Sequence, residues 1–307
     1  MATIQNNFSW SFTRHKSFEE CPRQYYYNYY GYWNGWNADA PDRARLAYRL
    51  KKIQTLPMWL GSLVHEMIER ILGDLRNREL NTLERYQQQA RERMNREWMQ
   101  SLEKKWQWKP KYNLNLFEHY YGLEITPEQR GQARDKVFTS LANFMRSEVF
   151  QRLEALRPAE WKTVEQLDQF PVNDQPIYIK IDCATCADES LTIYDWKTGR
   201  ETDDTLTQLG CYALYAFQTW HVPLERQKLV SFYLASNVVR ENVPTAAEVI
   251  QTKEFILGSM EAMIAALDSD AKQNRASEEK FAMTENRGSC RRCPFREICF
   301  GSREVAP

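Results

Sequence analysis

The chain lacks the long apolar segments that cross membranes. No apolar run in its 307 residues approaches the ~20 residues that a membrane-spanning helix requires. The N-terminal segment MATIQNNFSWSF has neither a basic start nor an apolar stretch, so a secretory signal is not expected. Internal repeats and low-complexity tracts are also missing, which excludes repeat architectures. We therefore expect a cytoplasmic protein without a membrane anchor.

The formal net charge is zero, but the basic and acidic residues are unevenly distributed along the chain. The whole chain carries 41 basic and 41 acidic side chains. Residues 1–111 hold 19 Lys and Arg against 12 Asp and Glu, a surplus of seven, and the remainder has the opposite surplus. A basic third beside an acidic remainder fits a protein that holds a polyanion on one face. Scattered surface charge explains the same numbers.

The composition is that of a soluble globular protein. Hydrophobic residues make up 43% of the chain and charged residues 27%. The length suits one large domain or two modest ones. Seven cysteines in a cytoplasmic chain are more typical of metal ligands or free thiols than of disulfides.

Residues 177–199, IYIKIDCATCADESLTIYDWKTG, predict two strands joined by a polar turn at 187–190. Asp182 is expected to end the first strand, and Asp195 and Lys197 the second. Period-two alternation puts Asp195 and Lys197 on one face and Trp196 on the other. Two carboxylates on adjacent strands repel unless a cation lies between them. Mg²⁺ or Mn²⁺ prefers such oxygen ligands, and Lys197 could hold a water or a phosphate oxygen.

An acidic residue two positions before a lysine is common in this chain, as at Glu103 and Lys105 or Asp270 and Lys272. The pair at 195 and 197 differs because it closes an apolar strand and follows a second acid at the end of the preceding one. This context favours a metal-dependent phosphodiesterase centre over a solvated hairpin end.

Two predicted helices flank the hairpin in sequence. Residues 60–75 form an amphipathic helix whose inward side carries His65. A lone histidine there is usually a hydrogen-bonded core residue. Residues 205–220 form the second helix, in which Gln208 and Tyr212 lie one turn apart. An earlier strand at 163–167 is expected to be followed by a turn near Asn173 and Asp174. Glu165, inside that strand, could point into the same site.

The remaining segments are less specific. The tyrosines of the helical stretch 11–36 suit a packed core, although aromatics interleaved with basic residues could also stack on bases. Residues 38–57 and 109–125 are expected to be loops. Residues 76–108 form a long, charged helical region, and 76–125 is interpreted as a helical insertion.

The C-terminal segment contains three clustered cysteines, Cys290, Cys293 and Cys299. One metal centre can join them, and Cys21 is the candidate for a fourth ligand. Four thiolates suit zinc or a [4Fe–4S] cluster, and three clustered cysteines with one remote partner look more like the latter. Such a clasp, formed by 281–307 with Cys21, would fasten the first helix to the last loop.

Together these pieces resemble the PD-(D/E)XK nuclease superfamily, and within it the RecB-type domains with an iron–sulfur clasp, such as AddB-type and CRISPR-associated adaptation nucleases. The resemblance covers most of the chain except 76–125. It implies one α/β domain over 1–307: a restriction-endonuclease-like core with a central mixed β-sheet flanked by helices, a helical N-terminal region and a cysteine clasp. The family's site motifs fall here on His65, Asp182, Asp195 with Lys197, and Gln208 with Tyr212, and its cluster cysteines on Cys21, Cys290, Cys293 and Cys299.

The resemblance implies hydrolysis of DNA, most simply by a single-strand exonuclease in repair, recombination or defence. Mg²⁺ or Mn²⁺ would be held by His65, Asp182, Asp195 and the Trp196 carbonyl, and Gln208 and Tyr212 would hold the phosphate backbone or a base. Asp195 replaces the more usual Glu, and no Pro-Asp dipeptide stands at the site. Two alternatives are a non-catalytic DNA-binding subunit for a helicase partner and a zinc-clasped binding module.

Overall fold

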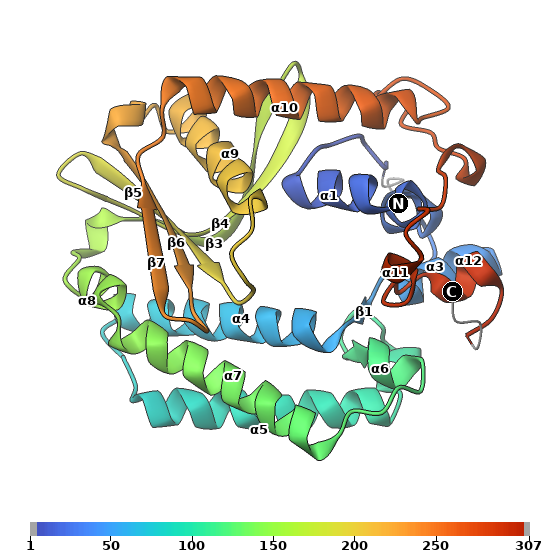
Figure 1. Ribbon diagram of the computed structural model, residues 1–307, viewed down its shortest axis with the longest axis horizontal. Coiled ribbons are helices and arrows are strands. Elements are labelled where there is room, and N and C mark those ends of the chain that lie inside the picture. Colours follow the sequence, from blue (N-terminus) through green and yellow to red (C-terminus); the bar gives the residue numbers. More distant parts are fainter. Residues whose placement is uncertain (1–4, 304–307) are drawn as a thin grey trace.

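A five-stranded mixed sheet forms the centre of the protein. The computed structural model describes residues 5–303 and is shown in Figure 1. The strands lie in the order β3-β4-β5-β6-β7, with β5 and β6 parallel and the other pairs antiparallel. Their bounds are β3 Trp161–Val172, β4 Gln175–Ala187, β5 Ser190–Lys197, β6 Gln227–Tyr233 and β7 Val238–Asn242. The prediction of an α/β fold with a central mixed sheet is confirmed.

Tight turns with positive φ connect the first three strands. Asn173 and Asp174 have φ of 46° and 60°, and Asp188 and Glu189 have φ of 47° and 61°. Two consecutive residues in this region match the twist of a two-residue hairpin. Both turns were predicted. The predicted end of the first strand at Asp182 was wrong, because β4 continues five residues further while pairing with β5.

One face of the sheet is covered by α9 Asp204–Thr219 and α10 Ala246–Ala265, with α1 Phe12–Glu20 nearby (Figure 1). Helix α9 is the crossover that the parallel pair β5 and β6 requires. This face buries the first hydrophobic cluster, which includes Ile177, Ile181, Ile193, Leu209, Tyr215 and Ile256.

The opposite face packs on α4 Leu56–Arg76 and α7 Pro127–Arg146, with α8 Glu148–Glu154 beside them. Helix α5 Leu83–Leu102 lies against α7 and α4. The second cluster includes Val64, Ile68, Tyr86, Ala90, Phe144, Cys183 and Trp196. Tyr86 and Ala90 of α5 are fully buried, so this part of the region interpreted as an insertion packs into the layer beneath the sheet.

A third cluster lies at the end of the molecule that carries both α3 and α12 (Figure 1). It includes Tyr27, Leu50, Trp106, Phe117, Tyr120, Phe295 and Ile298. Its residues come mainly from α2 Pro22–Tyr26, the π-helix Tyr27–Gly31, α3 Asp42–Leu50, β1 Ile53–Gln54, α6 Phe117–Tyr120 and α12 Arg296–Phe300. Strand β2 Asn115–Leu116 pairs with β1, and α11 Arg287–Cys290 precedes α12. Short 3₁₀ turns cover Lys105–Gln107, Pro158–Glu160, Leu224–Arg226 and Glu278–Lys280.

Two sequence expectations are corrected in this region. The expected loop at 38–57 contains α3 and β1, and the expected loop at 109–125 contains β2 and α6. The expectation that N-terminal tyrosines pack as core is confirmed, since Tyr25, Tyr27 and Tyr30 are buried. Within residues 5–303, none of the helices combines the length and apolar character needed to cross a membrane.

The contact between α9 and α10 makes a stability prediction. A Cβ on Gly210 would lie 2.3 Å from Thr252 Oγ1 and 3.3 Å from both its Cβ and Cγ2. Rotation of Thr252 would leave the tight contact with its Cβ and break the hydrogen bond from its hydroxyl to the Glu248 carbonyl. We expect Gly210→Ala to lower the free energy of unfolding by about 1–3 kcal/mol, measured by urea denaturation. Gly258→Ala is the control. A Cβ there meets no atom within 4 Å, and we expect a change of at most about 1 kcal/mol, in the stabilising direction. Equal effects would contradict the packing account.

Candidate metal centre

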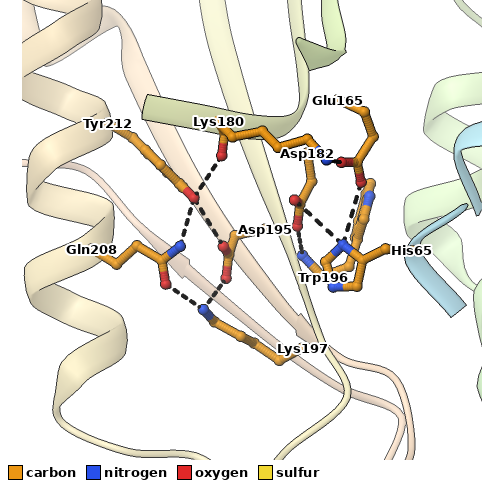
Figure 2. A network of polar contacts seen from close by, with 9 residues as sticks. All are labelled: His65, Glu165, Lys180, Asp182, Asp195, Trp196, Lys197, Gln208 and Tyr212. Carbon is orange, nitrogen blue, oxygen red and sulfur yellow. Dashed lines mark hydrogen bonds and ion pairs between the residues drawn. The ribbon is translucent and has the colours of Figure 1, made fainter. Parts of the chain in front are cut away.

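Two buried carboxylates face each other across β4 and β5. The pairing of Cys183 with Tyr194, extended by one residue, puts Asp182 opposite Asp195. Their exposed fractions are 6% and 2%. Asp182 Oδ2 accepts the backbone N–H of Trp196 at 2.7 Å (Figure 2), which fixes the orientation of this carboxylate. The Trp196 side chain points to the opposite face and packs on Phe144, as predicted.

Helix α9 holds a lysine against one of these carboxylates. Lys197 Nζ lies 2.7 Å from Asp195 Oδ2 and donates to Gln208 Oε1 at 2.7 Å. Gln208 Nε2 donates in turn to Tyr212 OH at 2.6 Å. Tyr212 OH donates to Lys180 O at 3.0 Å and lies 3.4 Å from Asp195 Oδ1 (Figure 2). The chain of contacts fixes Lys197 beside the acidic pair.

Helix α4 brings an imidazole to the other side of the pair. His65 Nδ1 lies 3.4 Å from Asp182 Oδ1 and 3.3 Å from Glu165 Oε1. Glu165 Oε2 also pairs with Lys180 Nζ at 2.5 Å. The ligand atoms of His65, Glu165 and Asp182 all lie within 4.8 Å of one another. Figure 2 shows these groups around the end of Asp182.

The backbone is distorted at the same place. Glu165 lies in β3 with a φ of 51°, a conformation that costs a non-glycine residue about 1–3 kcal/mol. On the paired strand the alternation breaks around Asp182, because Ile181 packs in the first cluster while Cys183 packs in the second. Strain of this kind concentrates at functional sites. Here it accompanies a Glu165 side chain that is 3% exposed and turned toward His65.

Comparison with known proteins identifies the family. The sequence model of the PD-(D/E)XK nuclease superfamily matches residues 9–300. The chain belongs to the PD-(D/E)XK nuclease superfamily. Among curated proteins there is no match. Eight chains among solved structures match, including the crystal structure of SSO0001, which is 17% identical over 57% of this chain and 78% of that chain with a TM-score of 0.29. This TM-score is too low to support a shared fold. The restriction-endonuclease-like fold is instead supported by the family match and the sheet topology.

PD-(D/E)XK nucleases use divalent metal ions, and the electrostatics of this site fit one. Burial alone would lower the pKa of His65, but Asp182 and Glu165 outweigh it and raise that pKa to about 10. Burial acts to raise the pKa of Glu165, but its bonds to His65 and Lys180 hold that pKa below the ordinary value. An imidazolium therefore lies between two carboxylates, in a position where a metal cation would offset the same charges.

Asp195 supplies a second indication that a cation fits this site. Burial, and then the charge of Asp182, raise the pKa of Asp195 to about 6 despite the opposing effect of Lys197. Asp195 Oδ2 is a buried oxygen whose close partner is the ammonium of Lys197 at 2.7 Å. Carboxylate oxygens with one imidazole nitrogen are a donor set suited to Mg²⁺ or Mn²⁺. The Trp196 carbonyl as a ligand stays a prediction.

The structure thus brings together the six side chains that the sequence motifs named: His65, Asp182, Asp195, Lys197, Gln208 and Tyr212. Glu165, which the sequence offered only as a possibility, lies among them. Lys180 was missed, because a lysine in an alternating strand suggests a solvent-facing position. The sequence signal for Lys180 is its position two residues before Asp182, because residues two apart in a strand lie on the same face.

The four clasp cysteines also gather at one place. Cys21 joins α1 to α2, Cys290 ends α11, and Cys299 lies in α12. Burial raises the pKa of the Cys293 thiol to about 12, and the other three thiols add to that rise. The pKa of Cys299 also rises to about 12, through burial first and through Cys21 and Cys290 after it. Cys183, Cys186 and Cys211 lie apart, in β4 and α9.

Cation binding at this centre should release protons. Because the pKa of His65 lies near 10, the imidazole is protonated at neutral pH and must lose its proton to bind a metal. We expect about one proton released per Mn²⁺ bound, measured by titration calorimetry at neutral pH in two buffers of different ionisation enthalpy. His65→Gln should reduce the release toward zero, whereas His221→Gln, at an exposed loop position, should leave it unchanged. Proton release that persists in His65→Gln would contradict the assignment of His65 as a metal ligand.

Proposed function

We propose that this chain hydrolyses phosphodiester bonds in DNA with the help of a divalent cation. The observation that supports this most strongly is the opposed, buried pair Asp182 and Asp195 with Lys197 held 2.7 Å from Asp195. A pair of this kind is costly to bury without a cation. The family match over residues 9–300 supplies the reaction class.

The proposed roles follow from the contacts of each side chain. His65, Glu165, Asp182, Asp195 and the Trp196 carbonyl would hold Mg²⁺ or Mn²⁺, which lowers the pKa of bound water and offsets charge on the phosphate. Lys197 donates hydrogen bonds to the attacking water or to a phosphate oxygen. Gln208 and Tyr212 orient Lys197 through the contacts described above. A direct contact of Gln208 or Tyr212 with the DNA backbone would require those bonds to exchange.

Single-stranded DNA is the substrate that we propose. Asp182 and Asp195 are almost fully buried, between strands and helices on both sides. A flexible single strand reaches such a recessed pair more readily than a duplex, which is stiff over about 150 base pairs. The resemblance of the motifs supports three further proposals. These are exonuclease action, membership of the RecB-type branch, and a helicase partner that supplies the unwound strand.

We also propose that the clasp binds a [4Fe–4S] cluster through Cys21, Cys290, Cys293 and Cys299. Three clustered cysteines with one remote partner are more typical of such a cluster, in which each thiolate binds a separate iron, than of a zinc site.

The nuclease proposal is tested with Asp195→Asn and Lys197→Ala on end-labelled single-stranded DNA with Mn²⁺, on protein kept free of oxygen. We expect each to lower the cleavage rate about 10³-fold or more, because each removes charge stabilisation specific to the transition state. The amide in Asp195→Asn should leave the melting temperature unchanged or raise it, since the buried carboxylate is costly in the absence of metal.

Asp188→Asn is the matched control, because Asp188 is exposed in the β4–β5 turn, and it should cleave like the wild type. Cleavage by Asp195→Asn at the control rate would contradict the proposal.

The clasp proposal is tested by metal analysis of protein purified without oxygen. We expect brown protein with about four iron atoms per chain and a reduced iron content in Cys290→Ser and Cys299→Ser. Cys186→Ser, on the hairpin away from the clasp, should keep its iron. Colourless protein that contains zinc would refute the cluster.

A further inference from the structure

Basic side chains without acidic partners gather where α3 leads into α4. Lys51 and Lys52 follow α3, and Lys111 approaches from the segment before β2. Within residues 5–303, no carboxylate forms an ion pair with Lys52 or Lys111, and Lys51 Nζ donates to the Asn28 carbonyl at 2.5 Å. The excess positive charge of the N-terminal third of the chain is therefore partly concentrated here.

A cavity of about 440 Å³ opens beside these lysines, between α4, α5 and residues 110–114. Two acids also line it, Glu66 and Glu97, but both are bound to Arg93. Glu97 accepts a further bond from Trp59 Nε1 at 2.6 Å. Arg93, Lys51, Lys52 and Lys111 together outnumber these two acids, so the cavity lining keeps a formal surplus of two positive charges.

Burial and neighbouring positive charge both act on the pKa values of these lysines. Burial, followed by the nearby charge of Lys111, lowers the pKa of Lys52. Burial, followed by Lys52 and Arg14, lowers the pKa of Lys51 to about 7. Like charges held together without a counter-charge are relieved by an anion, and a row of phosphates is the polyanion that suits several lysines at once.

Aromatic rings stand among the lysines. Lys52 Nζ lies 5.6 Å from the centre of the Tyr48 ring, and Lys111 Nζ lies 5.6 Å from that of Tyr112. Trp36, 6.0 Å from Tyr48, is 40% exposed, and Tyr112 is 73% exposed. Exposed rings beside cations are the pattern on which unpaired bases stack. We call Trp36, Tyr48, Lys52, Lys111 and Tyr112 the basic-aromatic surface.

Helix α4 connects this surface to the metal centre. Met58 and Ser62 line the cavity, and their spacing from His65 puts all three on one side of α4. Seven residues of helix separate Met58 from His65, about 10 Å. That distance corresponds to about three nucleotides at 3.4 Å per nucleotide.

We propose that the basic-aromatic surface binds the segment of single-stranded DNA adjacent to the phosphodiester at the metal centre. The inference rests on the proposed nuclease function and adds where the strand lies. Single-stranded DNA fits better than a duplex, because the rings can stack only on bases that are free of base pairing.

The test is fluorescence anisotropy of a labelled 12-nucleotide oligothymidylate in EDTA, so that binding is measured without cleavage. We expect Lys52→Glu with Lys111→Glu to weaken binding tenfold or more and to reduce the slope of log K against log salt by about 1.4, or 0.7 per lost phosphate contact. Tyr112→Ala should weaken binding about fivefold or more. Lys253→Glu with Lys272→Glu, at exposed positions on and after α10, is the matched control with the same change of charge and should bind like the wild type.

A second variant guards against misfolding at the partly buried Lys52. Lys111→Glu with Tyr112→Ala changes only exposed residues and should also weaken binding by fivefold or more. The proposal would be overturned by unchanged binding of this variant or by an equal loss of binding in the control. Tighter binding of a DNA duplex or an RNA strand would also overturn it.

Cleavage with Mn²⁺ is measured separately from binding. Wild type that binds but does not cut refutes the nuclease and leaves the surface standing, and wild type that cuts while the variants bind normally refutes only the surface.

Discussion

The repulsion between Asp182 and Asp195 is the constraint on which the rest of the structure depends. Neighbouring strands hold both carboxylates in the interior, where water cannot screen them. Without metal, two cationic groups offset them: Lys197 beside Asp195 and His65 beside Asp182. The site is thus arranged around positive charge, which is the physical reason to expect that a divalent cation can take the place of the imidazolium there.

The fold delivers these groups from opposite sides of the sheet. Helix α9 covers one face and fixes Lys197 through Gln208, while α4 lies under the other face and supplies His65. Each helix buries one face in a hydrophobic cluster, so neither can shift without opening that cluster. The third cluster joins the start of the chain to α12 beside the cysteines. It also supports the segment that carries the basic-aromatic surface.

Local patterns in the sequence were enough to predict the hairpin turns, α4, α9 and the side chains that meet around Asp182, because strand alternation and helical spacing are local properties. Longer-range features were not. Strands β1 and β2 are two residues each and exist only through their mutual pairing. The extent of β4 beyond Asp182 depends on its partner β5. The positive φ of Glu165 has no sequence signal, since that conformation is disfavoured for glutamate and is held by its surroundings.

The central claim is tested most directly by diffraction from crystals soaked in Mn²⁺, with the anomalous signal used to locate the ion. The account predicts a peak between the two strands, with oxygens of Asp182 and Asp195 about 2.0–2.6 Å from the ion and the His65 ring turned toward it. A crystal in which Mn²⁺ binds only elsewhere, with the Lys197–Asp195 and His65–Asp182 contacts intact, would contradict it.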